Sequence, residues 1–218
     1  MPPAIKAIET KYAGCRFRSR LEARYAVLFT YLGIRWDYEH EGYETPHGRY
    51  LPDFLLHLPT PTLFEVKPES ELGTTDLRWW HASRAADMPL IVAYGMPKPH
   101  RLNPQDQPGD GHYNLIDGRN EWEAWDNTYA FCICCTCGAV GIEFCGRAGR
   151  VCHHKGTGND DCATHDGRRC YSSDHVRLVD AYTSALSARF EHGESPRSSR
   201  IDSDPFYGLI IKHRGEHE

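Results

Sequence analysis

The sequence lacks a long apolar run and a recognisable secretory leader. No stretch of the 218 residues approaches the ~20 consecutive apolar residues of a membrane-spanning helix. The segment from Met1 to Lys6 lacks the apolar core of a secretory signal. These absences predict a cytoplasmic protein without a membrane partner. Hydrophobic residues form 40% of the chain, which suits one sizeable globular domain with a smaller module attached.

The chain also lacks an excess of positive charge. Its formal net charge of -5 at first argues against a nucleic-acid partner. Residues 1–35, however, carry seven Lys or Arg against two acids. Such a basic segment can contact phosphates even in an acidic protein, although a solvated helix face is its ordinary explanation. The candidates for contacts to backbone phosphates are Arg16, Arg18, Arg20 and Arg24.

Hydrophobic patterning predicts an α/β fold. Apolar residues at spacings of four, three and four predict an amphipathic helix over 17–33, ended by Gly33. A last helix is expected over 174–190. Between them, aromatic and branched residues predict three strands, a helix and a buried strand: 34–38, 49–56, 62–67, 74–87 and 89–95. The order α-β-β-β-α-β indicates a mixed sheet with helices packed on its faces.

Two acids and a lysine lie on neighbouring predicted strands. Because side chains alternate along a strand, Glu65 and Lys67 project from one face, and Asp53 can reach that face from the adjacent strand. Two carboxylates suit Mg²⁺, which needs few protein ligands, and the carbonyl of Val66 is a further candidate ligand. The metal would polarise a phosphate and lower the pKa of a bound water. Lys67 would orient that water or offset developing charge.

An ordinary structural explanation also exists for each of these side chains and for Glu22, an acid of the helix predicted over 17–33. Asp53 can be a turn residue after proline, Glu65 and Lys67 can form an exposed ion pair, and Glu22 can be a solvated helix acid. The apolar neighbours of Glu65 favour a half-buried strand, where a carboxylate needs a partner or a metal. If the helix over 17–33 packs over the sheet edge, Glu22 could complete the metal site or favour a second ion.

The segments Pro52-Asp53 and Glu65-Val66-Lys67, in this order of elements, resemble the PD-(D/E)XK nuclease superfamily. Glu22 falls where many members carry a helix acid. The resemblance covers residues 12–95 and implies a restriction-endonuclease-like core that hydrolyses DNA with Mg²⁺ or Mn²⁺. It also implies an origin in a bacteriophage or mobile element, hence a host cytoplasm, and a homodimer if both strands are cut. The catalytic residues that it implies are Glu22, Asp53, Glu65 and Lys67.

Eight of the nine cysteines crowd between residues 132 and 170. Without a secretory signal, such clustering favours metal ligation over disulfides. The segment from Cys134 to Gly138 contains C-x-x-C followed by glycine, as in a zinc knuckle. It resembles a zinc ribbon with structural Zn²⁺, and an iron–sulfur cluster is the alternative. The expected ligands are Cys134, Cys137, Cys152 and Cys170. The alternatives for the fourth ligand are Cys162, His165, His153 and His154.

The chain is expected to divide into three parts: a nuclease core over 1–112, a zinc-ribbon-like module with the last helix over 113–192, and a mobile polar tail over 193–218. The expected function is a metal-dependent DNA endonuclease whose zinc module helps to hold DNA, with no small-molecule cofactor. One other class is a non-catalytic zinc-dependent nucleic-acid-binding protein. Another is a zinc-stabilised protein of a recombination or packaging assembly. The intact acids and lysine argue against loss of catalysis.

Overall fold

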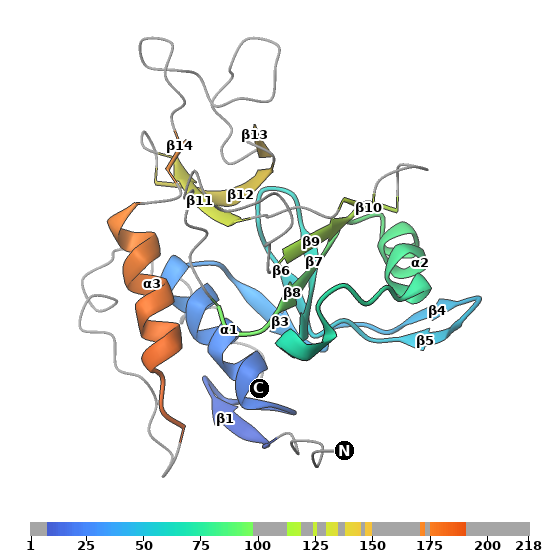
Figure 1. Cartoon of the computed structure of the whole chain (residues 1–218), viewed down its shortest axis with the longest axis horizontal. Helices are drawn as coiled ribbons and strands as arrows, with labels where there is room; N and C mark the ends of the chain where they lie inside the picture. The colour runs from blue at the N-terminus through green and yellow to red at the C-terminus, as the bar shows by residue number, and fades with distance from the viewer. Residues whose placement is uncertain are drawn as a thin grey trace, which may run out of the picture.

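The centre of the molecule is a six-stranded mixed sheet, with its strands in the order β10-β9-β8-β7-β6-β3 (Figure 1). The computed structural model describes residues 8–97, 113–118, 124–125, 130–134, 138–144, 147–149, 171–172 and 175–190. The strands of the central sheet are β3 (Trp36–Tyr38), β6 (Phe54–Leu56), β7 (Thr62–Lys67), β8 (Leu90–Tyr94), β9 (Tyr113–Ile116) and β10 (Ala124–Trp125). β7 and β8 pair in parallel, and the other neighbours are antiparallel. The predicted mixed α/β class is therefore confirmed.

Helix α1 (Arg20–Leu32) covers one face of this sheet. The Ser19 hydroxyl accepts the Glu22 amide at the N-terminus, and Gly33 ends the helix in the left-handed conformation at φ 71°. The apolar face of the helix packs onto β6 and β7, with the Phe29 ring near the rings of Phe54 and Phe64. The predicted start at residue 17 is too early, because a hairpin of β1 (Thr10–Tyr12) and β2 (Cys15–Phe17) precedes the helix.

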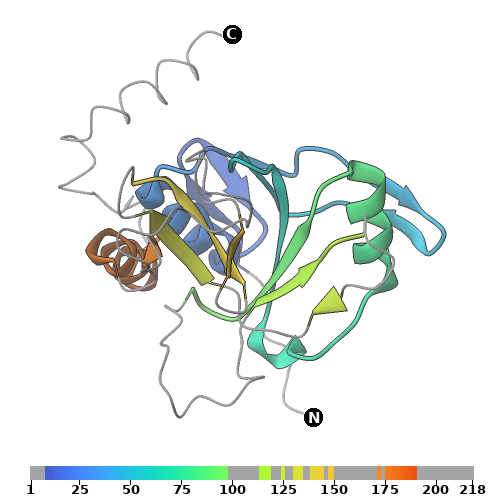
Figure 2. The ribbon, with the colours of Figure 1, turned by 90° about the horizontal axis from the view of Figure 1, so that it is seen from above.

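The strand predicted over 49–56 is two strands. Its first part is β5 (Gly48–Tyr50), which pairs with β4 (Tyr43–Thr45) in a separate hairpin that projects from the body of the molecule (Figures 1 and 2). Its second part is β6, in the central sheet. Pro52 lies between them, and a proline cannot donate to a strand ladder. The interruption turns the chain at Asp53.

The other face of the sheet carries α2 (Leu77–Ala86), which is capped by Asp76 and follows the 3-10 helix η1 (Glu69–Glu71). The hairpin of β4 and β5 packs against α2. Helix α3 (Val176–Ser187) lies beside α1 (Figures 1 and 2). The helices predicted over 74–87 and 174–190 are thus present and shorter. No helix in the described part of the chain is long and apolar enough to cross a membrane.

A second sheet has the strand order β13-β12-β11-β14. Its strands are β11 (Ala130–Cys134), β12 (Val140–Phe144), β13 (Arg147–Gly149) and β14 (Tyr171–Ser172). Phe131 of β11 lies within 6.4 Å of the rings of Phe29 and Phe64, so this sheet shares the core of the first. β8 also pairs with β9 across the boundary predicted after residue 112. The division of the chain into independent domains stays a prediction.

Candidate metal centre

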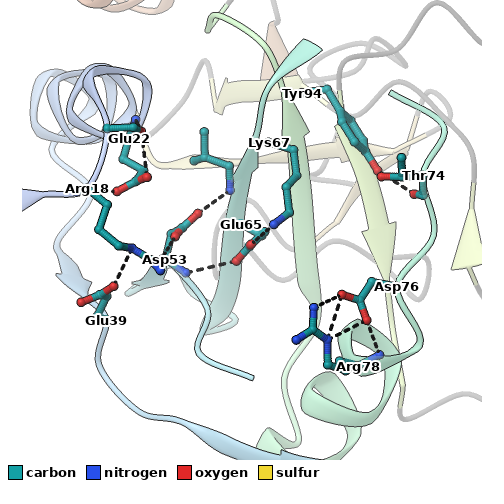
Figure 3. Close-up of polar contacts among 12 residues, drawn as sticks. Arg18, Glu22, Glu39, Asp53, Glu65, Lys67, Thr74, Asp76, Arg78 and Tyr94 are labelled. Atoms are coloured by element: carbon teal, nitrogen blue, oxygen red, sulfur yellow. Dashed lines mark hydrogen bonds and ion pairs between the residues drawn. The ribbon is translucent and has the colours of Figure 1, made fainter. Parts of the chain in front are cut away.

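Asp53 and Glu65 lie together at one end of the β6–β7 pair (Figure 3). The antiparallel register places Phe54 opposite Phe64, so the next step brings Asp53 opposite Glu65. The Asp53 amide donates to Oε2 of Glu65 at 3.3 Å, and the Val66 amide donates to Oδ2 of Asp53 at 2.8 Å. The backbone of each strand segment therefore donates a hydrogen bond to a carboxylate of the other segment. This reciprocal pair fixes both acids on the backbone.

Two cations approach the carboxylates from opposite sides (Figure 3). Lys67 Nζ lies 2.7 Å from Oε1 of Glu65, as expected for side chains two residues apart on one face. Arg18 Nη2 lies 2.8 Å from Oδ1 of Asp53, and its Nε lies 2.9 Å from Glu39. Arg18, one of the four predicted phosphate contacts, is therefore engaged with a carboxylate of the site.

Glu22 extends from the first turn of α1 and is the third buried acid of this region. Ser19 Oγ donates to its Oε1 at 2.7 Å, while Tyr38 Oη and the Arg18 amide donate to its Oε2 at 2.6 Å and 3.1 Å. Burial, and next the bond to Glu22, raise the pKa of Tyr38, so its hydroxyl stays protonated and donates. Both oxygens of Glu22 already have protein donors. These donors hold Glu22 in place, and its ligation of a metal stays a prediction.

Negative charge outweighs positive charge at this site. Glu22, Asp53 and Glu65 are only 7%, 3% and 5% exposed, and the cations that contact these acids in the described part of the chain are Arg18 and Lys67. Burial is the largest cause that raises the pKa of Asp53 well above its ordinary value, and the charges of Glu65 and Glu22 come next. A carboxylate desolvated in this way is stabilised by an added cation.

The geometry suits a hydrated magnesium ion rather than a closed cage of protein ligands. Among the residues that the structure describes, no three His, Cys, Asp or Glu side chains form a group ready to hold a metal ion. Mg²⁺ commonly binds through one or two carboxylates and keeps several waters, which fits Asp53 and Glu65. At Val66 it is the amide that contacts Asp53. The carbonyl of Val66 as a ligand stays a prediction.

The other predicted phosphate contacts lie apart from the carboxylates. Arg24 Nη1 donates to the carbonyls of Ala185 and Leu186 at 2.8 Å and 2.5 Å, near the end of α3. This arginine joins α1 to α3, and its guanidinium is occupied there. Arg16 lies on the exposed hairpin before α1, 3.6 Å from Glu9. Arg20 is the first residue of α1.

Several neighbours of the site were not predicted from the sequence. Tyr38 and Glu39 bind Glu22 and Arg18, respectively. Asp76 caps α2 and binds the guanidinium of Arg78 next to Glu65 and Lys67 (Figure 3). An aspartate just before a helix is a recognisable capping signal. That signal predicts the cap but does not show that the helix begins beside the carboxylates.

The predicted zinc site falls mostly outside the described residues. Cys134 is the last residue of β11, and the structure describes its backbone but not its side chain. The remaining predicted ligands and their alternatives lie outside the described residues: Cys137, Cys152, Cys170, Cys162, His165, His153 and His154. The segment that follows the expected zinc knuckle forms the strand β12. Zinc ligation itself stays a prediction.

Comparisons with known proteins identify no relative: no family model, no curated protein and no solved structure matches this chain. Function must therefore be inferred from the chemistry of the site.

In metal-free buffer, Asp53 is expected to make the protein less stable as pH rises. The pKa of Asp53 is raised above the ordinary 3.8. Between pH 3.8 and this raised pKa, the folded state therefore binds a proton more tightly than the unfolded chain does. The contribution of this proton to the free energy of unfolding is complete below pH 3.8 and is lost as pH rises through the folded pKa. Urea unfolding in EDTA over this range measures it as the difference between wild type and Asp53→Asn. A difference that is constant with pH, or that shifts in favour of wild type as pH rises, would contradict this expectation.

Proposed function

We propose that the protein is a Mg²⁺- or Mn²⁺-dependent DNA endonuclease. The observation that carries the proposal is the meeting of Asp53, Glu65 and Lys67 at one end of β6 and β7, where three buried acids contact two cations among the described residues. A divalent ion held by Asp53 and Glu65 would supply the missing charge. The resemblance to PD-(D/E)XK nucleases concerns these same residues and supports the same chemistry.

Asp53 and Glu65 would hold the ion, which would supply Lewis-acid activation of the scissile phosphate and of an attacking water. In the hydrolysis, the oxygen of one water would form a bond to phosphorus as the bond from phosphorus to the leaving sugar oxygen breaks, and one proton of that water would end on the leaving oxygen. Burial lowers the pKa of Lys67, but the nearby Glu65 carboxylate outweighs burial and the pKa is raised above 10.5. Lys67 is therefore an ammonium at neutral pH. It is suited to stabilising charge on the phosphate rather than to accepting a proton.

The surrounding residues would position this machinery. Arg18 binds Asp53 and Glu39 together, and Glu22 holds the Arg18 backbone through Oε2. Arg18 therefore acts through Asp53 in the resting site, with a side chain that is 59% exposed and able to face a phosphate. Exposed Arg16 is the better candidate for a contact to the DNA backbone, together with Arg20.

The remaining parts of the proposal lie beyond the carboxylate site. Structural Zn²⁺ bound by Cys134, Cys137, Cys152 and Cys170 would stabilise the cysteine-rich segment and help to hold DNA. A homodimer would be needed for cleavage of both strands. A bacteriophage or mobile-element setting remains part of the proposal through the family resemblance alone.

The proposed function is tested by metal-dependent binding and cleavage. Mg²⁺ at about 100 times its Kd should stabilise the protein by about 2.7 kcal/mol, and thus raise Tm by roughly 5–10 °C relative to EDTA. Supercoiled plasmid, single-stranded and branched DNA are incubated with Mg²⁺, Mn²⁺ or EDTA. We expect cleavage of at least one substrate with either metal and none with EDTA. DNA binding without cleavage would instead favour the non-catalytic class, and no shift in Tm would remove the metal site.

A further inference from the structure

The hydroxyl of Tyr50 is buried without a hydrogen-bond partner among the described residues. Tyr50 is the last residue of β5, two positions before Pro52, and is only 6% exposed. A buried polar group without a partner destabilises the folded protein relative to one that is hydrogen-bonded. A buried hydroxyl of this kind is rare in a folded protein and needs a structural or functional explanation.

The ring of Tyr50 is held between the start of α2 and the carboxylate site. The Arg78 guanidinium lies 5.7 Å from the ring centroid, and Asp76 fixes that guanidinium through contacts of 2.5–3.0 Å. Within the site, the hydroxyl interacts with the carboxylate of Glu65. The contact does not meet ordinary hydrogen-bond geometry, which leaves the hydroxyl without a formal partner. Burial, followed by the charge of Glu65, raises the pKa of Tyr50 well above 10.0, so the phenol is a neutral donor.

Both carboxylate oxygens of Glu65 already contact a donor. Oε1 binds Lys67, and Oε2 accepts the Asp53 amide. A divalent ion on Glu65 would repel the Lys67 ammonium from this carboxylate. A neutral hydroxyl can donate to the same carboxylate without that repulsion. Among the described residues, Tyr50 offers a buried hydroxyl without a hydrogen-bond partner beside Glu65.

We propose that Tyr50 is a positioning residue of the metal site, whose hydroxyl donates to Glu65 and holds this carboxylate in the orientation that binds the divalent ion. The inference rests on the proposed function, because it concerns a ligand of the same ion. Partners that orient metal ligands typically contribute about 10–100-fold to metal affinity or activity. A tyrosine that only fills space would contribute nothing to either.

The test compares Tyr50→Phe with wild type in Mn²⁺ binding, measured by isothermal titration calorimetry. We expect the Kd for Mn²⁺ to rise about tenfold or more. Tm in EDTA should stay the same or rise, because phenylalanine keeps the ring and removes an unsatisfied hydroxyl. Weaker metal binding without lower stability separates positioning from packing. The rate of DNA cleavage by Tyr50→Phe at subsaturating Mg²⁺ should also be lower than that of wild type, and it should recover as the Mg²⁺ concentration is raised.

Tyr43→Phe is the matched control. Tyr43 pairs directly with Tyr50 across the hairpin, and its pKa is raised by burial and Glu41 rather than by the acids of the site. This variant should bind Mn²⁺ as wild type does. Wild-type affinity in Tyr50→Phe would overturn the inference while leaving metal-dependent cleavage by wild type intact. No Mn²⁺ binding by wild type would overturn both this inference and the proposed function.

Discussion

Replacing Asp53 by alanine is expected to lower the rate of DNA cleavage by at least about a thousandfold, since a catalytic metal supplies several kcal/mol of transition-state stabilisation. Asp53 offers one of the two carboxylates that meet at the ends of β6 and β7. Without it, a hydrated ion would retain Glu65 alone. The variant should also lose the rise in Tm that Mg²⁺ produces in wild type. The measurements are single-turnover cleavage and thermal melting with Mg²⁺ or EDTA.

Lys67→Ala should separate binding of the metal from chemistry. Lys67 is paired with Glu65 and is not a metal ligand, so Mn²⁺ binding should be kept or strengthened while the cleavage rate falls. The control is Glu44→Ala, which removes an exposed hairpin carboxylate paired with Arg49 at 2.8 Å. It should cleave DNA as wild type does. Activity that persists in both Asp53→Ala and Lys67→Ala would place catalysis elsewhere in the chain.

The part of the site on β7 could be predicted from the sequence because its geometry is local. An apolar, branched segment bounded by proline predicts β7 over Thr62–Lys67, and the structure has the same bounds. Alternation along this strand then places Glu65 and Lys67 on one face, where they form an ion pair. The register with β6 needs only the neighbouring strand. Asp53 follows from the two strands together.

Contacts between distant segments could not be predicted in this way. Arg24 was interpreted as a phosphate contact because it lies in a basic segment, yet it binds carbonyls about 160 residues later in the chain. The strand predicted over 49–56 is divided because Pro52 cannot donate to the ladder, although its aromatic and branched residues suit a continuous strand. Tyr50 belongs to the half that leaves the sheet. Its place beside Glu65 depends on how the hairpin packs against α2.

The side chain of Phe54, the residue that follows Asp53 in the sequence, is expected to contribute much of the stability of the fold. Phe54 is 1% exposed and faces α1, whereas Asp53 faces the metal site. Five aromatic rings lie 5.3–6.5 Å from the Phe54 ring: Phe17, Phe29, Trp36, Tyr38 and Phe64. Phe54→Ala should therefore lower the free energy of unfolding by about 3–5 kcal/mol, measured by urea denaturation. A cavity at this position removes packing from β3, β6, β7 and α1 together.

Because Phe54 and Asp53 are consecutive, packing at the first should also affect chemistry at the second. Phe54→Leu keeps an apolar side chain, so we expect a folded protein that is moderately less stable and binds Mn²⁺ more weakly than wild type. The surface control is Leu51→Ala, since Leu51 is 38% exposed on the other side of Pro52. This control should cost less than about 0.5 kcal/mol. A loss of under about 1 kcal/mol in Phe54→Ala would show that the aromatic cluster does not hold β6 in register.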